Sequence, residues 1–138
     1  SYDTVVAFLL LLYRRPPPPP LFPYTTLFRS LDSWSEWKQF LTALSKDPNI
    51  NKRRASLVLL TGPIAKTDDV RVRDLSFILI GRLQGEREIL ITKAVSWLLR
   101  CMVTHHSHEV TDYLEQHTST LPAIALRETH NKIRTGKK

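Results

Sequence analysis

The chain has 138 residues, a formal net charge of +7 and a hydrophobic content of 42%. This length suits one ordinary domain, and the composition excludes the disordered and fibrous classes of protein. The positive charge predicts affinity for a polyanion such as nucleic acid or an anionic membrane. A single cysteine excludes an intrachain disulfide and a cysteine-based zinc site, so we expect a reducing compartment such as a cytoplasm.

The first 30 residues differ from the rest of the sequence. An apolar run at 5–12 is far shorter than the roughly 20 residues that span a bilayer, and its arginines follow it, unlike those of a signal peptide. The proline run at 16–20 is typical of a polyproline linker or an SH3 ligand. The string at 14–30, however, resembles the conceptual translation of a sequencing adapter. We therefore expect residues 1–30 to be non-native and assign function to residues 31–138.

From Leu31 onward, apolar residues recur at the spacing of amphipathic helices. Gly62-Pro63 is expected to end the second helix, Thr67 to cap the third, and Ser107 to cap the fifth. Pro122 falls near the first turn of the last helix, where proline is tolerated. The predicted helices lie at about 31–44, 51–61, 68–83, 87–104, 108–116 and 121–135.

These six helices, joined by short breaks and without a strand pattern, predict an all-α fold of about three antiparallel pairs. One pair alone is too thin to bury its apolar face, and stacking the pairs into a solenoid solves that problem. An irregular helical bundle is the alternative architecture.

The helix at 87–104 carries a tryptophan outside its apolar stripe. At 100° per residue, the core stripe consists of Ile91, Ala94, Val95, Leu98 and Met102. Trp97 lies roughly 120° from this stripe, beside Lys93 and Arg100. It either packs against a neighbouring helix pair or presents a flat aromatic face within a phosphate-binding strip.

The helix at 51–61 begins with three consecutive cations, Lys52, Arg53 and Arg54. They form either a solvated basic end or an anion site, because cations at a helix start are opposed by the helix dipole. A phosphate would offset that repulsion, and arginine matches its geometry.

The remaining candidates for chemistry are weaker. His105, His106 and His108 lie across a predicted helix end with Glu109 as the nearest carboxylate, so we expect a solvated turn and no metal site. Cys101 lies among apolar residues, which favours a small buried side chain over a reactive thiol.

Three ordered segments resemble the AlkD-like DNA alkylation repair family. Segment 92–100 (TKAVSWLLR) is similar to its Lys-Ala-(Ile/Val)-(Gly/Ser)-Trp-x-Leu-Arg signature. Segment 52–60 (KRRASLVLL) resembles its Arg-Arg-Ala helix, and segment 121–132 (LPAIALRETHNK) resembles the closing helix of one branch. The resemblance covers about Trp37 to Lys138.

This resemblance implies a right-handed, HEAT-like solenoid whose concave basic face holds duplex DNA. The family includes glycosylases that remove cationic N3- and N7-alkylated purines. By matching position, the catalytic residues would be Trp97, against the lesion-bearing deoxyribose, and Arg54, at the nearby phosphate. The other residues expected to contact DNA are Lys52, Arg53, Lys93, Arg100, Arg127 and Lys132.

The family's catalytic aspartate, four residues after an aromatic residue, is not found in register. Lys38 follows Trp34 at that spacing, and Leu41 follows Trp37. We therefore expect this chain to be the C-terminal part of a glycosylase-like protein and inactive alone. The alternatives are a DNA-binding relative without catalysis and a protein-binding helical-repeat scaffold. We expect no cofactor, no membrane contact and a monomer.

Overall fold

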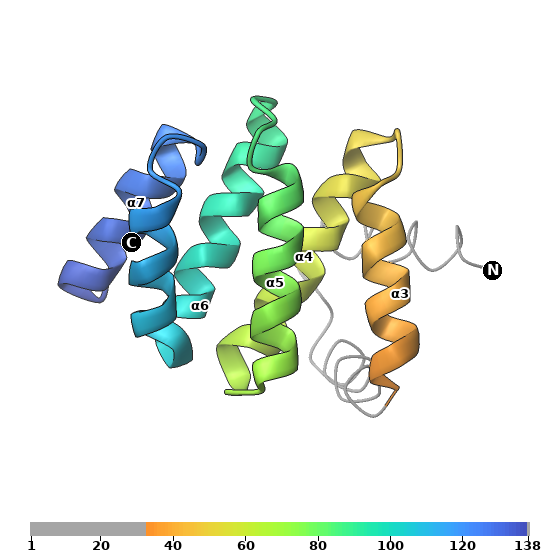
Figure 1. Cartoon of the computed structure of the whole chain (residues 1–138), viewed down its shortest axis with the longest axis horizontal. Helices are drawn as coiled ribbons and strands as arrows, with labels where there is room; N and C mark the ends of the chain where they lie inside the picture. The colour runs from red at the N-terminus through yellow and green to blue at the C-terminus, as the bar shows by residue number, and fades with distance from the viewer. Residues whose placement is uncertain (1–32, 138) are drawn as a thin grey trace, which may run out of the picture.

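The computed structural model describes residues 33–137, and within this range it consists of helices joined by short connections (Figure 1). The expected non-native segment 1–30 and the start of the first predicted helix lie outside the described residues. The helices are α3 (Trp34–Ser45), α4 (Ile50–Lys66), α5 (Val70–Leu83), α6 (Ile89–Gln116) and α7 (Ala123–Thr135).

Helix α4 is longer than predicted, because Gly62-Pro63 does not end it. Pro63 lies inside the helix and removes one backbone donor, yet Ile64 beyond it is fully buried in the core. Burial of such a side chain contributes about 1.5–3 kcal/mol, which offsets much of the cost of an internal proline. The helix ends at Lys66, where the backbone N–H of Thr67 donates to the Pro63 carbonyl.

Thr67 therefore does not cap the third predicted helix. Asp69 takes this role for α5, because its carboxylate accepts a hydrogen bond of 2.9 Å from the backbone N–H of Arg71. A carboxylate at this position also complements the positive end of the helix dipole.

The fourth and fifth predicted helices are joined into α6, with a kink between them. His106 has non-helical dihedral angles (φ −133°, ψ 38°), so the direction of the chain changes there and no cap at Ser107 is needed. We refer below to the N-terminal segment of α6 (89–105) and to its C-terminal segment (107–116).

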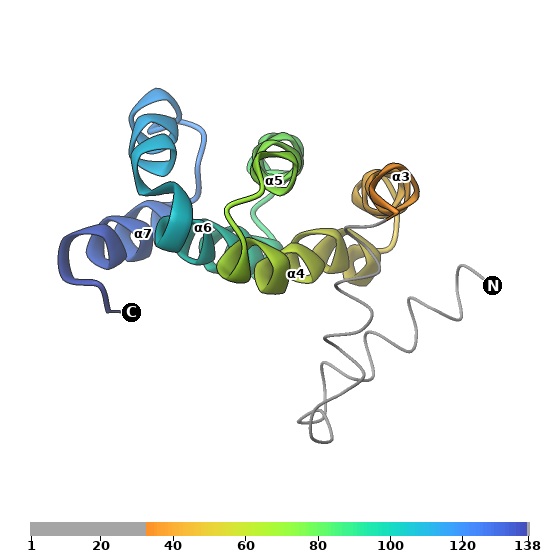
Figure 2. The same cartoon turned by 90° about the horizontal axis from the view of Figure 1, so that it is seen from below.

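The helices form two layers, which Figure 2 shows nearly end-on. One layer contains α3, α5 and the C-terminal segment of α6. The other contains α4, the N-terminal segment of α6 and α7, and in this layer α6 packs against both α4 and α7. The pairs are α3 with α4, α5 with the N-terminal segment of α6, and the C-terminal segment of α6 with α7. The described residues therefore form the predicted HEAT-like stack of three pairs.

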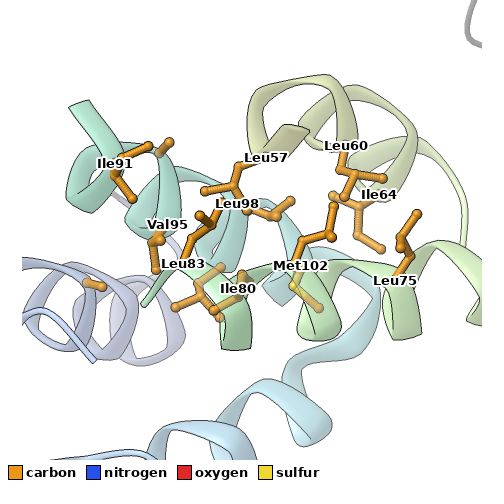
Figure 3. Close-up of a cluster of buried hydrophobic side chains, with 14 of the residues drawn as sticks. Leu57, Leu60, Ile64, Leu75, Ile80, Leu83, Ile91, Val95, Leu98 and Met102 are labelled. Carbon is orange, nitrogen blue, oxygen red and sulfur yellow. The ribbon is translucent and has the colours of Figure 1, made fainter. Parts of the chain in front are cut away.

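The core lies between the two layers and confirms the predicted apolar stripe of α6. Ile91, Ala94, Val95, Leu98 and Met102 are each at most 2% exposed. Figure 3 shows four of them against leucines and isoleucines of α4 and α5, among them Leu57, Leu60, Ile64, Leu75, Ile80 and Leu83. Cys101, expected to be buried, is only half-buried.

Candidate nucleic-acid interface

The two layers differ strongly in charge. The layer of α4, the N-terminal segment of α6 and α7 carries nine lysines and arginines and one acidic residue, Glu128. We call it the basic layer. Its cations are Lys52, Arg53, Arg54, Lys66, Lys93, Arg100, Arg127, Lys132 and Arg134. The opposite layer has four cations (Lys38, Arg71, Arg73, Arg82) and five acids (Glu36, Asp74, Glu109, Asp112, Glu115). Positive charge is therefore concentrated on one face, as in proteins that bind polyanions.

The helices of the basic layer run in the same direction, so their N-terminal ends lie at one edge of the stack (Figure 1). Arg54, Lys93 and Arg127 each occupy the fifth position of their helix. The positive ends of three helix dipoles thus add to the field of these side chains. Sequence patterns alone did not reveal this row, because it depends on which helices share a layer.

Trp97 lies in the middle helix of the basic layer. It is half-buried, while the five core-stripe residues of the same helix are buried. Lys93, one turn earlier, is exposed, and Arg100, one turn later, is half-buried. Trp97 therefore lies between two cations, outside the buried stripe of the helix. Contact of this face with DNA stays a prediction.

The three cations at the start of α4 have different surroundings. Arg53 donates two hydrogen bonds to the Glu86 carboxylate, of 3.1 and 2.8 Å, and others to the carbonyls of Asp47 and Pro48. Its side chain is 19% exposed. Lys52 lies 3.6 Å from the Asp47 carboxylate. These intramolecular bonds show that Arg53 links α4 to the loops around it. Contact of Arg53 with DNA stays a separate prediction.

Arg54 faces a different environment from Arg53. It is half-buried and interacts with a neighbouring group of the protein. Of the three cations, Arg54 is the one that belongs to the row formed with Lys93 and Arg127. Its predicted role at a phosphate is compatible with this placement and stays a prediction.

The candidates nearer the C-terminus are partly engaged within the protein. A terminal nitrogen of Arg100 lies 3.4 Å from the Glu128 carboxylate of α7, and its Nε donates to the Ser96 carbonyl. The Lys132 ammonium donates to the Gly136 carbonyl at 3.0 Å, which caps the end of α7. Arg127 is exposed. The predicted DNA contacts at Arg100 and Lys132 would have to compete with these bonds.

The histidine cluster does not form the solvated turn that was expected. His106 is 4% exposed and its Nε2 atom has no hydrogen-bond partner, while His105 Nε2 lies 3.1 Å from the Ala65 carbonyl. Burial lowers the pKa of His106, because desolvation penalises the charged imidazolium. Within residues 33–137, no group of three or more His, Cys, Asp or Glu side chains could hold a metal ion.

The fold and the charge distribution define a class of protein: a HEAT-like helical solenoid with one strongly basic layer. The sequence model of the DNA alkylation repair enzyme family matches residues 24–133, and the chain belongs to this family. The match begins upstream of Leu31. No curated protein matches the chain. Along the described part of the chain, no helix combines the length and the apolar character needed to cross a membrane.

Proposed function

We propose that the basic layer binds duplex DNA carrying a cationic N3- or N7-alkylated purine, as part of DNA alkylation repair in the cytoplasm. The charge asymmetry between the two layers carries this proposal. Three adjacent helices carry nine cations and one carboxylate. Although Lys52 and Arg53 are paired with loop carboxylates, the remaining surplus of positive charge complements the DNA backbone, and phosphate contacts supply most of the affinity of such proteins.

In this proposal Arg54 contacts the phosphate next to the lesion, and the Trp97 ring lies against its deoxyribose. Excision breaks the glycosidic bond, whose electron pair leaves with the base and neutralises its positive charge. The charge develops on the sugar, where aromatic faces and a carboxylate stabilise it before water adds.

Glu128, the one carboxylate on the helices of the basic layer, is paired with an arginine. Glu128 lies 3.4 Å from Arg100 in an ion pair whose side chains are 31% and 16% exposed, respectively. A carboxylate neutralised by an arginine stabilises a developing cation less than an unpaired one does. Because the family's catalytic aspartate is also not found in register, we expect this chain to bind alkylated duplex DNA and to release the base slowly or not at all.

Two measurements test the proposal. In the first, the chain is titrated into fluorescent duplex DNA at several salt concentrations, and binding should weaken steeply with salt. Binding that is absent or independent of salt would contradict the DNA-binding role and favour a protein-interaction scaffold. In the second, methylated DNA is incubated with the chain and released 7-methylguanine is quantified. Rapid release would contradict the expected inactivity and assign glycosylase activity to this chain.

A further inference from the structure

The basic layer contains an open groove on α7, at the end of the helix stack. It has a volume of about 840 Å³. Two exposed arginines, Arg127 and Arg134, and the exposed His130 line it. Its other lining residues are Glu128, Asn131 and Ile133. Of these side chains, only Arg127 was predicted from the sequence to bind DNA.

The groove is suited to an extended anion. Arg127 and Arg134 are seven residues apart, so they lie on the same side of α7 about 10 Å apart along its axis. The charge of Glu128, the acidic residue of the groove, is opposed by Arg100. Arg134 donates a hydrogen bond of 3.1 Å to Asn131 Oδ1, and a guanidinium has five N–H donors.

We propose that this groove binds the phosphodiester backbone of the duplex beyond the lesion, as a second anchor point. The inference rests on the proposed function. Continuity supports a DNA backbone over an acidic protein segment, because α7 packs directly beside α6 in the same basic layer. The groove meets the row of cations that begins at Arg54 at Arg127, and from there it runs along α7.

Helix packing sets the approximate distance between the two anchor points. Packed helices lie 8–10 Å apart, so the two helix spacings from α4 through α6 to α7 amount to roughly 16–20 Å. Because duplex DNA rises 3.4 Å per base pair, this separation corresponds to roughly six base pairs. The phosphate in the groove should thus lie about six positions from the phosphate bound by Arg54.

The test uses the full chain and duplexes in which one phosphate at a time is replaced by an uncharged methylphosphonate. For the unmodified chain, we expect affinity losses at two positions about six apart. Arg54→Ala should abolish the effect at one position, and Arg134→Ala or His130→Ala at the other. Arg134→Ala should also reduce the slope of log affinity against log salt by about one. Lys38→Ala, an exposed cation of the opposite layer, is the control.

The outcomes separate this inference from the proposed function. If the unmodified chain binds and Arg54→Ala weakens binding, but Arg134→Ala and His130→Ala behave like Lys38→Ala, the groove does not bind DNA. If Arg134→Ala abolishes binding of a polyglutamate peptide and leaves DNA binding unchanged, the groove belongs to an acidic protein partner. If the unmodified chain does not bind duplex DNA, the proposed function itself is wrong.

Discussion

The guanidinium of Arg53 and the carboxylate of Glu86 are joined by two parallel hydrogen bonds across 33 residues of sequence. This pair connects the first turn of α4 to the loop between α5 and α6. Because the same guanidinium also binds the carbonyls of Asp47 and Pro48, one side chain ties together two of the turns in the stack.

Replacement of Arg53 by alanine should therefore reduce the stability of the fold. Hydrogen bonds to charged groups contribute about 1.5–3 kcal/mol, and partial exposure of this pair lowers the expected loss to about 1–2 kcal/mol. Urea unfolding followed by circular dichroism measures the loss. Arg53→Lys should not restore stability, because an ammonium cannot make the paired contact. Lys52→Ala, at a longer ion pair, should change stability by less than about 0.5 kcal/mol.

The tryptophan of the basic layer should affect DNA binding, and a tryptophan of the opposite layer should not. Trp97 and Trp34 are both half-buried, and Trp34 lies under the Arg71 guanidinium at 5.4 Å. We expect Trp97→Ala to lower affinity for alkylated duplex DNA about tenfold, since an aromatic contact is worth roughly 1–2 kcal/mol. Trp34→Ala should leave affinity within about twofold. Equal effects of the two substitutions would show that Trp97 acts only through folding.

Removal of the negative charge of Glu128 should strengthen DNA binding. Glu128→Gln releases Arg100 from its ion pair and removes the one acidic group of the basic layer. We expect affinity for duplex DNA to rise about fivefold, which corresponds to an interaction of roughly 1 kcal/mol between partly exposed charges. Fluorescence anisotropy at two salt concentrations measures this change. Unchanged or weaker binding would mean that neither Arg100 nor Glu128 faces the DNA.

The buried histidine at the kink of α6 should make stability depend on pH. Burial lowers the pKa of His106 below its ordinary value of 6.5. The charges of Glu109 and Asp68 raise this pKa, whereas those of Arg73 and His105 lower it. The folded state therefore favours the neutral ring. The contribution of the neutral His106 ring to stability is fully present above about pH 6.5, and it is lost as the pH falls through the lowered pKa.

His106→Gln should remove this part of the pH dependence, as measured by urea unfolding between pH 5 and 8. His108→Gln replaces an exposed histidine two residues away and is the matched control. If both variants show the same pH dependence as the unmodified chain, protonation of His106 does not affect the stability of the fold.

The sequence predicted the helices and the core stripe of α6 because their apolar periodicity is strong. It misplaced the boundaries at 62–69, because the effect of Pro63 depends on how deeply Ile64 is buried. It could not show that Arg53 meets a carboxylate 33 residues away. The row formed by Arg54, Lys93 and Arg127 requires knowledge of which helices share a layer. The sequence did contain one indication of this row, because α4 and the first half of α6 have no acidic residues.

The most direct test compares two triple variants with matched changes of charge. One replaces Arg54, Lys93 and Arg127 in the basic layer by glutamine, and the other replaces Lys38, Arg71 and Arg82 in the opposite layer. The measurement is the affinity for duplex DNA as a function of salt. We predict that the first variant loses most of its affinity and that its log–log salt slope falls by about three, while the second binds like the unmodified chain. Equal loss in both variants, or loss in the second alone, would contradict the assignment of DNA binding to the basic layer.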